Sequence, residues 1–293
     1  MYEAAFCQRV DEGSDRELMV ICELCPHKCH IPNGRRGVCG TRANHDGRLI
    51  VENYGMVSSL SLDPIEKKPL SRFMPGSMIL SAGSYGCNFH CPFCQNHDIA
   101  RPIDGPALCR FIEPADLVDM AVSLTKRGNI GLAYTYNEPI TWYEYVLDTA
   151  TLIKEKDMKN VLVSNGFISE RPLLRLLPLI DAANIDLKGF SEDFYHNIAG
   201  GRLDAVKHTI NLMSSSCHVE VTTLVIPGLN DSHEQMHAQA AWLASISTDI
   251  PLHLSRFFPN YKMLDRQKTP AATLYELQAI AREYLNYVYL GNI

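Results

Sequence analysis

The chain has 293 residues, with 27 Lys and Arg against 33 Asp and Glu, and 46% of its residues are hydrophobic. This length and composition exclude an intrinsically disordered chain and allow one large α/β domain or two ordinary ones. The net charge of -6, spread along the chain without basic runs, disfavours binding to nucleic acid or to anionic lipid by bulk charge.

The ten cysteines are the unusual feature of the composition. The first twenty residues include acidic side chains and no apolar core of a leader sequence, and no later stretch approaches the roughly 18 apolar residues of a membrane span. We therefore expect a reducing compartment, the cytoplasm, in which disulfides are rare. Metal or redox chemistry then explains the cysteines best, because seven of the ten lie in two tight groups. The other three are Cys7, Cys109 and Cys217.

Residues 1–72 are rich in turn residues and contain only short strand-like runs. They predict a small, Cys-rich, metal-binding extension. Its cysteines have the spacing Cys22-x2-Cys25-x3-Cys29-x9-Cys39. Four thiolates are a closed ligand set for zinc or for a second iron-sulfur cluster, and an unligated set is a third possibility.

The kind of metal in this extension matters to mechanism. A closed cluster could relay electrons, whereas zinc could only stabilise the fold. The neighbouring His27 and His30 could replace a thiolate as ligands. The spacing alone leaves these alternatives open.

Residues 73–293 follow a different pattern, in which short apolar runs alternate with amphipathic stretches of helical length. The predicted strands are 78–80, 130–136, 161–163, 182–187, 219–226, 252–254 and 287–290, and predicted helices include 114–126, 142–156, 234–245 and 272–285. This alternation predicts parallel strands joined by right-handed crossovers, as in a partial (β/α)6-type TIM barrel. A doubly wound sheet is the alternative. In both architectures the site should lie at the carboxyl ends of the strands.

Three cysteines directly follow the first of these strands, in the run Cys87-Asn-Phe-His-Cys91-Pro-Phe-Cys94. Three thiolates within eight residues can ligate three corners of a cubane iron-sulfur cluster and leave one iron without a protein ligand. Glycines just before the first cysteine allow the loop to turn sharply, so that the three side chains can converge. Two alternatives are three buried thiols and a zinc site completed by His90 or His97.

The spacing Cys-x3-Cys-x2-Cys, with the aromatic Phe93 just before the third cysteine, resembles the signature of the radical S-adenosylmethionine (radical SAM) superfamily. The resemblance implies that Cys87, Cys91 and Cys94 hold a [4Fe-4S] cluster whose open iron chelates S-adenosylmethionine, with Phe93 among the cofactor-binding residues. It also implies that cluster reduction cleaves the cofactor into methionine and a 5'-deoxyadenosyl radical, which abstracts a hydrogen atom. The protein supplies positioning and exclusion of water.

The strand that ends near residue 136 leads into Asn137-Glu138-Pro139, which places a carboxylate at the predicted active end of the sheet. This position resembles the Gly-Gly-Glu segment that contacts the amino group of S-adenosylmethionine in the superfamily. The resemblance therefore implies that Glu138, with Asn137, binds the cofactor. Because Tyr and Asn replace the two glycines, Glu138 carries the resemblance better than its neighbours. The alternative is a helix start with Asn137 as N-cap.

The next two strands also end in polar residues. Ser164 and Asn165 could hydrogen-bond a ribose or a carboxylate, although a plain Asn-Gly turn explains them as well. Asp186 and Lys188 alternate to the same side of a strand. We assign these four residues to cofactor binding, and the alternative for the charged pair is a solvated salt bridge.

The fifth and sixth strands give weaker indications. The fifth ends in an apolar run and a Pro-Gly turn, which could pack against a flat ligand such as adenine or simply end the strand. The sixth contains His253 and Arg256. Arg256 could bind a carboxylate bidentately, whereas a histidine in an apolar strand is more often a satisfied core residue.

Several segments together resemble one branch of the superfamily, the group related to pyruvate formate-lyase activating enzymes. They are Cys94-Gln-Asn96 with Asp98, Asn137-Glu138-Pro, Asp186-Leu-Lys188, Val-Ile-Pro-Gly228 and Val288-Tyr-Leu-Gly-Asn292. Within this branch, Cys22-x2-Cys25-Pro-His-Lys-Cys29 with Gly37-Val-Cys39-Gly40 most resembles the radical SAM enzyme of the AmmeMemoRadiSam system. The resemblance covers nearly the whole chain and leads us to expect a short further tail after Ile293.

This resemblance implies partnership with AMMECR-type and Memo-type proteins, and an electron donor such as flavodoxin or ferredoxin. We predict an oxidoreductase-type, activase-like radical SAM enzyme that abstracts hydrogen from an unidentified protein or small molecule. A glycyl-radical enzyme activase is one alternative. Another is a non-catalytic iron-sulfur or zinc protein that transfers electrons or scaffolds an assembly. The sequence has no basic groove or base-stacking set, so we expect no nucleic-acid partner, and no membrane association.

Overall fold

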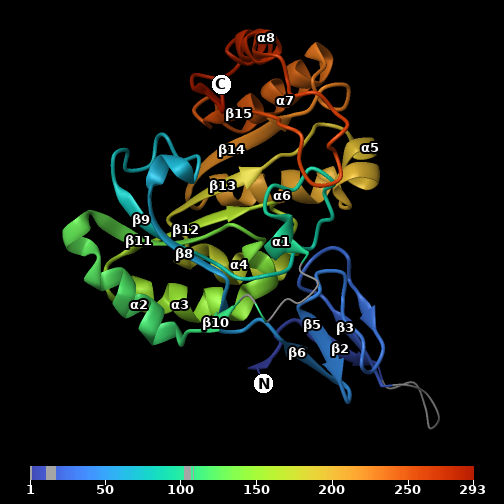
Figure 1. The fold of residues 1–293 in the computed structure, drawn as a ribbon, viewed down its shortest axis with the longest axis vertical. Helices are drawn as coiled ribbons and strands as arrows, with labels where there is room; N and C mark the ends of the chain where they lie inside the picture. The colour runs from blue at the N-terminus through green and yellow to red at the C-terminus, as the bar shows by residue number, and fades with distance from the viewer. Residues whose placement is uncertain (1, 11–17, 102–106, 108) are drawn as a thin grey trace.

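The computed structural model describes residues 2–10, 18–101, 107 and 109–293. Its main element is an eight-stranded sheet with helices packed around it, and small antiparallel sheets from the amino-terminal part of the chain lie beside it (Figure 1). The strands of the main sheet are β8 (Ser59–Pro64), β9 (Met78–Gly83), β11 (Asn129–Tyr134), β12 (Lys159–Ser164), β13 (Ala182–Asp186), β14 (His218–Val225), β15 (Leu252–Arg256) and β16 (Val288–Gly291).

The order of these strands decides the architecture. Each parallel strand from β9 to β16 pairs with the strand that follows it in the main sheet, and β8 pairs antiparallel with β9 at one edge. In a doubly wound sheet the order reverses at one point. Without a reversal, right-handed crossovers place the helices on one face, and the sheet curls around the other. The prediction of a partial TIM barrel is therefore confirmed, and the doubly wound alternative is wrong.

Helices follow the parallel strands and bury their apolar sides against the sheet. They are α2 (Pro114–Ser123), α3 (Tyr143–Glu155), α4 (Glu170–Leu176), α6 (Leu203–Ser214), α7 (His233–Ile246) and α8 (Ala271–Ala281). Local sequence explains their starts: α2 has Pro at its first turn, and the Ser232 side chain caps α7 by accepting from Gln235 N. Among the described residues, no helix is long and apolar enough to span a membrane.

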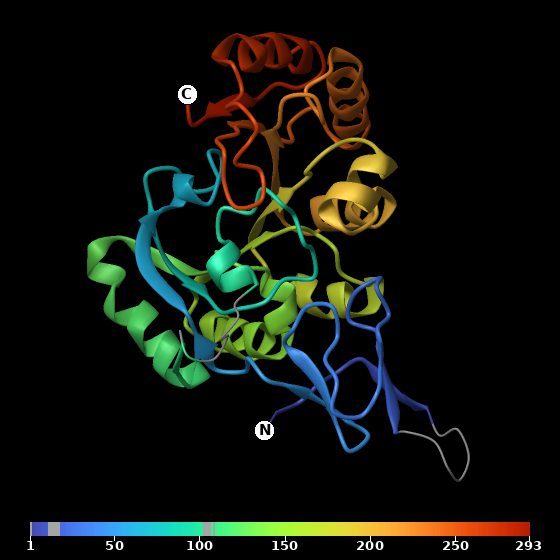
Figure 2. The ribbon, with the colours of Figure 1, turned by 45° about the vertical axis from the view of Figure 1, so that its right-hand side comes forward.

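The amino-terminal part contributes strands to three small sheets. One contains β1 (Tyr2–Glu3), β5 (Arg42–His45) and β6 (Arg48–Val51), and another contains β2 (Cys7–Val10), β3 (Met19–Cys22) and β4 (His30–Ile31). The third pairs β7 (Met56–Val57) with β10 (Arg110–Phe111). Figures 1 and 2 both place this extension beside the segment that contains α1 (His97–Ala100). The predicted boundary between the extension and the barrel, near residue 72, stays a prediction. The strand β8 lies before this boundary but pairs with β9 of the main sheet.

The loop between β8 and β9 crosses the amino ends of the barrel strands. The carboxylate of Glu220 on β14 accepts hydrogen bonds from Ser71 N at 3.0 Å and from Arg72 N at 2.7 Å. The same carboxylate bonds to His218 at 3.0 Å and to His253 at 2.6 Å. His253 is thus a buried residue whose imidazole has a hydrogen-bond partner, and it lies near the amino end of β15 (Leu252–Arg256).

Candidate functional site

A cavity of about 280 Å3 lies where the barrel strands end. It brings together residues from the loops after β9, β11, β12 and β13. Of the residues that the sequence predicts for the barrel site, the cavity is lined by Cys87, Cys91, Phe93, Cys94, Asn137, Glu138, Asn165, Asp186 and Lys188. The site therefore lies at the predicted edge of the sheet.

The loop that carries the three cysteines turns at Gly86, whose φ is +89°. A Cβ atom there would lie 2.3 Å from Cγ2 of Thr41 and 2.9 Å from the carbonyl oxygen of Cys39, so the position requires glycine. Further along the loop, His90 N donates to Ala199 O at 3.0 Å. The cysteine loop is thus packed between the extension and the segment after β13.

The three thiols lie in a low-dielectric environment. Burial raises the pKa of Cys91 to about 11, and it also raises the pKa of Cys87 and of Cys94. The Lys188 ammonium opposes this increase in pKa at Cys91 and Cys94, because a nearby cation favours thiolates. Phe93 is buried, and its ring centroid lies 6.2 Å from that of Phe194.

Glu138 is a buried carboxylate held by three donors. Its Oε1 accepts from Ile140 N at 3.0 Å and from Ser164 Oγ at 2.7 Å, and its Oε2 accepts from Asn165 N at 2.8 Å. Burial raises its pKa to about 7, although these hydrogen bonds act in the opposite direction. Such a carboxylate gains from a cationic partner in the cavity.

The neighbours of Glu138 position it. Ser164 does not line the cavity, since its hydroxyl donates to the carboxylate. Asn137 is not the N-cap of the following turn, as the alternative reading supposed: Glu138 caps it through Ile140 N. The Asn137 side chain instead accepts from Ser84 N at 2.9 Å and donates to Gly86 O at 3.0 Å. It therefore joins the β11 end to the cysteine loop.

Asp186 and Lys188 form an ion pair within the cavity, with Lys188 Nζ 3.0 Å from Asp186 Oδ2. Burial by itself lowers the pKa of Lys188, but Asp186 and the neighbouring Cys91 and Cys94 outweigh burial and raise it. The side chain of Asp186 is 36% exposed, so this carboxylate is accessible from the cavity. The pair can meet both charges of a zwitterionic ligand.

Other cavity residues have no sequence signal that singles them out. Tyr136 has a φ of +73° and donates from its hydroxyl to Asp63 Oδ2 at 2.8 Å. Thr222 has a buried Oγ1 for which the described residues provide no hydrogen-bond partner. Both line the cavity, as does Arg101. Arg256 does not; its Nε donates to Thr269 O at 2.6 Å.

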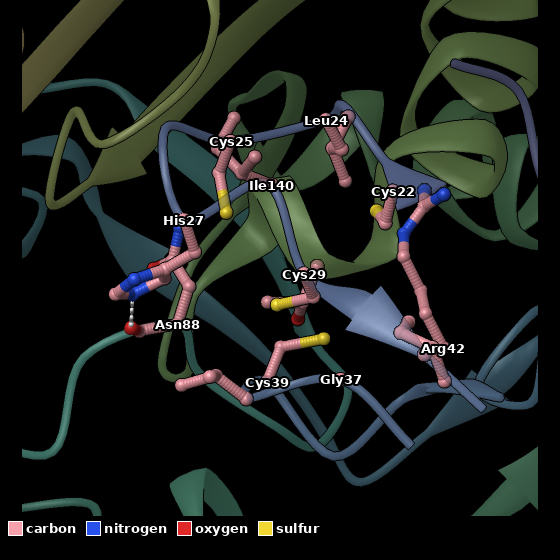
Figure 3. A pocket seen from close by; sticks show the side chains of 13 residues that line it. Cys22, Leu24, Cys25, His27, Cys29, Gly37, Cys39, Arg42, Asn88 and Ile140 are labelled. Carbon is pink, nitrogen blue, oxygen red and sulfur yellow. Dashed lines mark hydrogen bonds between the residues drawn. The ribbon is translucent and has the colours of Figure 1, made fainter. Parts of the chain in front are cut away.

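The four cysteines of the extension surround a second, much smaller cavity of about 20 Å3 (Figure 3). Cys22 ends β3, Cys29 precedes β4, and Cys39 lies in the turn before β5. Burial raises the pKa of Cys22 to about 11 and that of Cys25 to about 12. The rest of the lining combines apolar and polar side chains, namely Leu24, Ile31, Val38 and Ile140 with His27, Arg42, Asn88 and Thr141.

A buried ion pair borders this second cavity. Arg42 is 1% exposed, and its Nη2 donates to both carboxylate oxygens of Glu144, at 2.8 and 2.5 Å. Arg42 Nε is buried and has no hydrogen-bond partner among the described residues. Sequence reasoning missed this pair, because residues 42 and 144 are far apart in the chain and share no motif.

The comparisons with known proteins agree with this geometry. An uncharacterized protein of Methanocaldococcus jannaschii is 39% identical over 297 residues, which cover 100% of this chain and 86% of that protein. Another protein of the same organism, provisionally named a glycyl-radical enzyme activating enzyme, is 20% identical over 210 residues, or 70% of this chain and 77% of the relative.

Solved structures share the fold. A radical SAM methyltransferase from Sphaerobacter thermophilus has a TM-score of 0.56 and 12% identity, covering 97% of this chain and 76% of that one. Streptococcus suis SuiB bound to S-adenosylmethionine has a TM-score of 0.56 and 15% identity, covering 73% of this chain and 51% of that one. The profile of the radical SAM superfamily matches residues 82–240, more than half of the chain. The chain belongs to the radical SAM superfamily.

Proposed function

We propose that this protein cleaves S-adenosylmethionine reductively and uses the resulting radical to abstract hydrogen from a protein or small-molecule substrate. One observation supports this most directly: three thiols and a buried carboxylate, Glu138, line one cavity at the carboxyl ends of the barrel strands. Membership of the superfamily implies the two cofactors, a [4Fe-4S] cluster and S-adenosylmethionine.

The residues present fit these cofactors. Cys87, Cys91 and Cys94 offer three soft ligands and leave space for a fourth ligand from a small molecule. Glu138 offers a negative charge and Lys188 a positive charge, which match the amino and carboxylate groups of S-adenosylmethionine. The orphaned Thr222 hydroxyl provides one more hydrogen-bonding group. When bound, the cluster supplies the electron that breaks the sulfonium bond.

The protein residues orient the cofactor and exclude water. Ser164 and the backbone of Asn165 fix the Glu138 carboxylate, so that it meets an ammonium group without reorganisation. Asn137, which precedes Glu138 in the chain, donates to Gly86 O and so joins the end of β11 to the cysteine loop. Asp186 holds the Lys188 ammonium in place.

We propose that the substrate is presented together with AMMECR-type and Memo-type partner proteins in the cytoplasm, with flavodoxin or ferredoxin as electron donor. A glycyl-radical activase is a second candidate, favoured by the relative that bears this name. The two differ only in whether the substrate is a glycine of a partner protein. Electron paramagnetic resonance of the partner, with or without a glycyl doublet, separates them.

We also propose that the extension binds a metal centre through Cys22, Cys25, Cys29 and Cys39, since all four line one cavity. A non-catalytic iron-sulfur or zinc protein would have this centre but would need neither Glu138 nor an open iron in the barrel.

The test is an anaerobic reaction of the reconstituted protein with dithionite and S-adenosylmethionine. We expect 5'-deoxyadenosine and methionine in equal amounts, measured by liquid chromatography. Addition of candidate partner proteins should then increase the turnover or label a partner. No 5'-deoxyadenosine under any of these conditions would contradict the proposal and favour the non-catalytic alternative.

A further inference from the structure

We propose that Tyr136 is a positioning residue, which Asp63 and Lys68 hold in a left-handed backbone conformation and which sets how Glu138 meets the cysteine loop. The cysteine loop consists of residues 84–96, which lead from β9 to α1. The proposal rests on the proposed function, because it concerns the binding of S-adenosylmethionine in the barrel cavity.

The backbone of Tyr136 has a conformation that residues with a Cβ atom disfavour. Its φ of +73° lies in the left-handed region, which is about 5- to 30-fold less populated for an L-residue than the right-handed one. Glycine adopts such a φ without steric cost, and glycine occupies this position in the Gly-Gly-Glu segment that residues 136–138 resemble. A strained residue of this kind persists only where its surroundings hold it.

The side chain of Tyr136 is held by a buried ion pair at the edge of the main sheet. Its hydroxyl donates to Asp63 Oδ2 at 2.8 Å, and Lys68 Nζ donates to the same oxygen at 2.9 Å. Lys68 Nζ also lies 4.6 Å from the centroid of the Tyr136 ring, within the range of a cation–π interaction. The side chains of Lys68 and Asp63 are only 4% and 10% exposed, so water competes little for these contacts.

Asp63 keeps its charge at neutral pH. Burial by itself raises the pKa of this carboxyl, but the hydrogen bonds from Lys68 and Tyr136 outweigh burial and lower the pKa to about 2. Lys67 adds a weaker contact, 3.6 Å from Asp63 Oδ1, through a side chain that is 68% exposed. The anchor of the tyrosine ring therefore depends mainly on Asp63 and Lys68 together.

The backbone around Tyr136 contacts both ends of the cysteine loop. At the far end of the loop, Asn96 Nδ2 donates to the carbonyl oxygen of Tyr136 at 2.6 Å. At the near end, Asn137 Nδ2 donates to Gly86 O at 3.0 Å. The next residue is Glu138, whose N–H donates to the same oxygen at 3.4 Å. This short stretch of backbone thus joins the carboxylate to the loop that carries the three thiols.

The end of β9 packs closely against the same stretch. A Cβ atom at Gly83 would lie 2.7 Å from the carbonyl oxygen of Thr135 and 3.0 Å from Cβ of Tyr136. A change of Tyr136 to a negative φ would redirect the chain that follows it, and with it Glu138. We therefore expect the ion pair on the β8 side to affect cofactor binding, although its two residues lie outside the cavity lining.

The main test compares Tyr136→Ala with Tyr136→Gly. Alanine loses the anchor and keeps the penalty on a positive φ, whereas glycine loses both. Titration of the anaerobically reconstituted chains with S-adenosylmethionine, followed by electron paramagnetic resonance, measures the Kd. We expect the Kd of Tyr136→Ala to exceed that of Tyr136→Gly by about 5- to 30-fold. Glycine should stay within about 3-fold of the unmodified chain. A merely structural role of the ring would harm glycine at least as much as alanine.

Amide hydrogen exchange gives a readout that needs no cofactor binding. We expect peptides that cover residues 84–96 and 138–141 to exchange faster in Tyr136→Ala than in Tyr136→Gly or the unmodified chain. The matched control is Tyr54→Phe, which removes a tyrosine hydroxyl bonded to Asp148 Oδ2 at 2.6 Å, away from the barrel cavity. It should leave both the exchange of these peptides and the Kd unchanged.

A further set of variants tests whether the ion pair acts through the tyrosine. Tyr136→Phe removes the hydrogen bond, and Asp63→Leu/Lys68→Met removes both charges together, so that neither is left buried alone. We expect the two changes to raise the Kd by a similar factor. In the Tyr136→Gly background, Asp63→Leu/Lys68→Met should cause no further increase. A full additional increase there would contradict action through Tyr136.

Equal Kd values and equal exchange for Tyr136→Ala and Tyr136→Gly would overturn the proposal, as would different exchange with equal Kd values. If Tyr136→Ala does not fold, Tyr136→Phe and the unmodified chain provide the comparison. An unmodified chain that does not bind S-adenosylmethionine, with the expected order of exchange, would contradict the proposed function and support the anchor. Binding that is equally tight in every variant would do the reverse.

Discussion

The two cysteine cavities of this protein differ in size, lining and number of thiols. The barrel cavity has a volume of about 280 Å3, three cysteines and charged side chains on several strand ends. The extension cavity has a volume of about 20 Å3, four cysteines and a wall that combines apolar and polar side chains. The cavity with only three cysteines is thus the one that has the volume and the charged side chains to bind a small molecule.

The barrel cavity is therefore suited to a reaction, whereas the extension cavity is suited to a metal centre with a complete set of protein ligands. In the barrel, Glu138 and the Asp186–Lys188 pair face the same space as the thiols. In the extension, the charge of Arg42 is already shared with Glu144, and no room remains for a substrate. Four substitutions test whether the two cavities are as distinct as they look.

The largest effect should come from Cys91→Ala. It removes one of three thiols in the barrel cavity, whose lining among the described residues includes no fourth cysteine. We expect the rate of 5'-deoxyadenosine formation to fall by at least about 1,000-fold, because the catalytic group is lost as a unit. Cys217→Ala, away from both cavities, should keep its rate. An undiminished rate for Cys91→Ala would contradict the assignment of the reaction to the barrel cavity.

Arg42→Met should be the most destabilising of the four. It leaves the Glu144 carboxylate buried without its cation, which costs about 3–5 kcal/mol in the free energy of unfolding. The matched control is Arg36→Met, because Arg36 pairs with Glu52 but its side chain is 59% exposed. There we expect a change of about 0–1 kcal/mol. Urea denaturation of the metal-free variants gives both values. Equal losses of unfolding free energy would show that the buried Arg42–Glu144 pair stabilises the fold no more than the exposed Arg36–Glu52 pair.

Glu138→Gln should weaken binding of S-adenosylmethionine without removing the thiols. Loss of a charged partner for the amino group should raise the Kd by about 10- to 100-fold. Ser164→Ala removes one of the donors that orient Glu138 and should have a smaller effect in the same direction. Anaerobic titration followed by electron paramagnetic resonance measures the Kd. An unchanged Kd for Glu138→Gln would remove this residue from the cofactor site.

Asn88→Ala should give the smallest effect, at the boundary between the cavities. Its side chain donates to Phe167 O at 2.8 Å and accepts from Asn165 at 2.8 Å. We expect a loss of about 1–3 kcal/mol in the free energy of unfolding, because buried partners lose their bonds. The exposed Asn33→Ala is the control, with a change near zero. If both variants lose equally little, the contact between the two cysteine groups is weaker than the hydrogen bonds indicate.

The sequence predicts the parts of this molecule that depend on local patterns. Apolar runs mark all the parallel strands of the main sheet, and the cysteine spacing marks the barrel site. Both depend on neighbours a few residues apart, so one segment contains the information. The prediction for Glu138 works for the same reason, since the residue follows a strand end.

Features that depend on packing between distant segments escape such reasoning. The Arg42–Glu144 pair joins residues 102 positions apart. The choice between Glu138 and Asn137 as the capping residue depends on Ser84 and Gly86, which engage the Asn137 side chain. Thr222 becomes a cavity residue only because β14 lies beside β13 in the curled sheet.

The Glu220 carboxylate has a consequence for how the barrel can move. It fastens the loop between β8 and β9, near one edge of the sheet, to β14 and β15, near the other edge. Arg72 adds a hydrogen bond to the Tyr287 hydroxyl at 3.2 Å, just before β16. These hydrogen bonds hold the amino ends of the strands together. A motion that opens the barrel to a bulky partner must therefore separate the strands at their carboxyl ends.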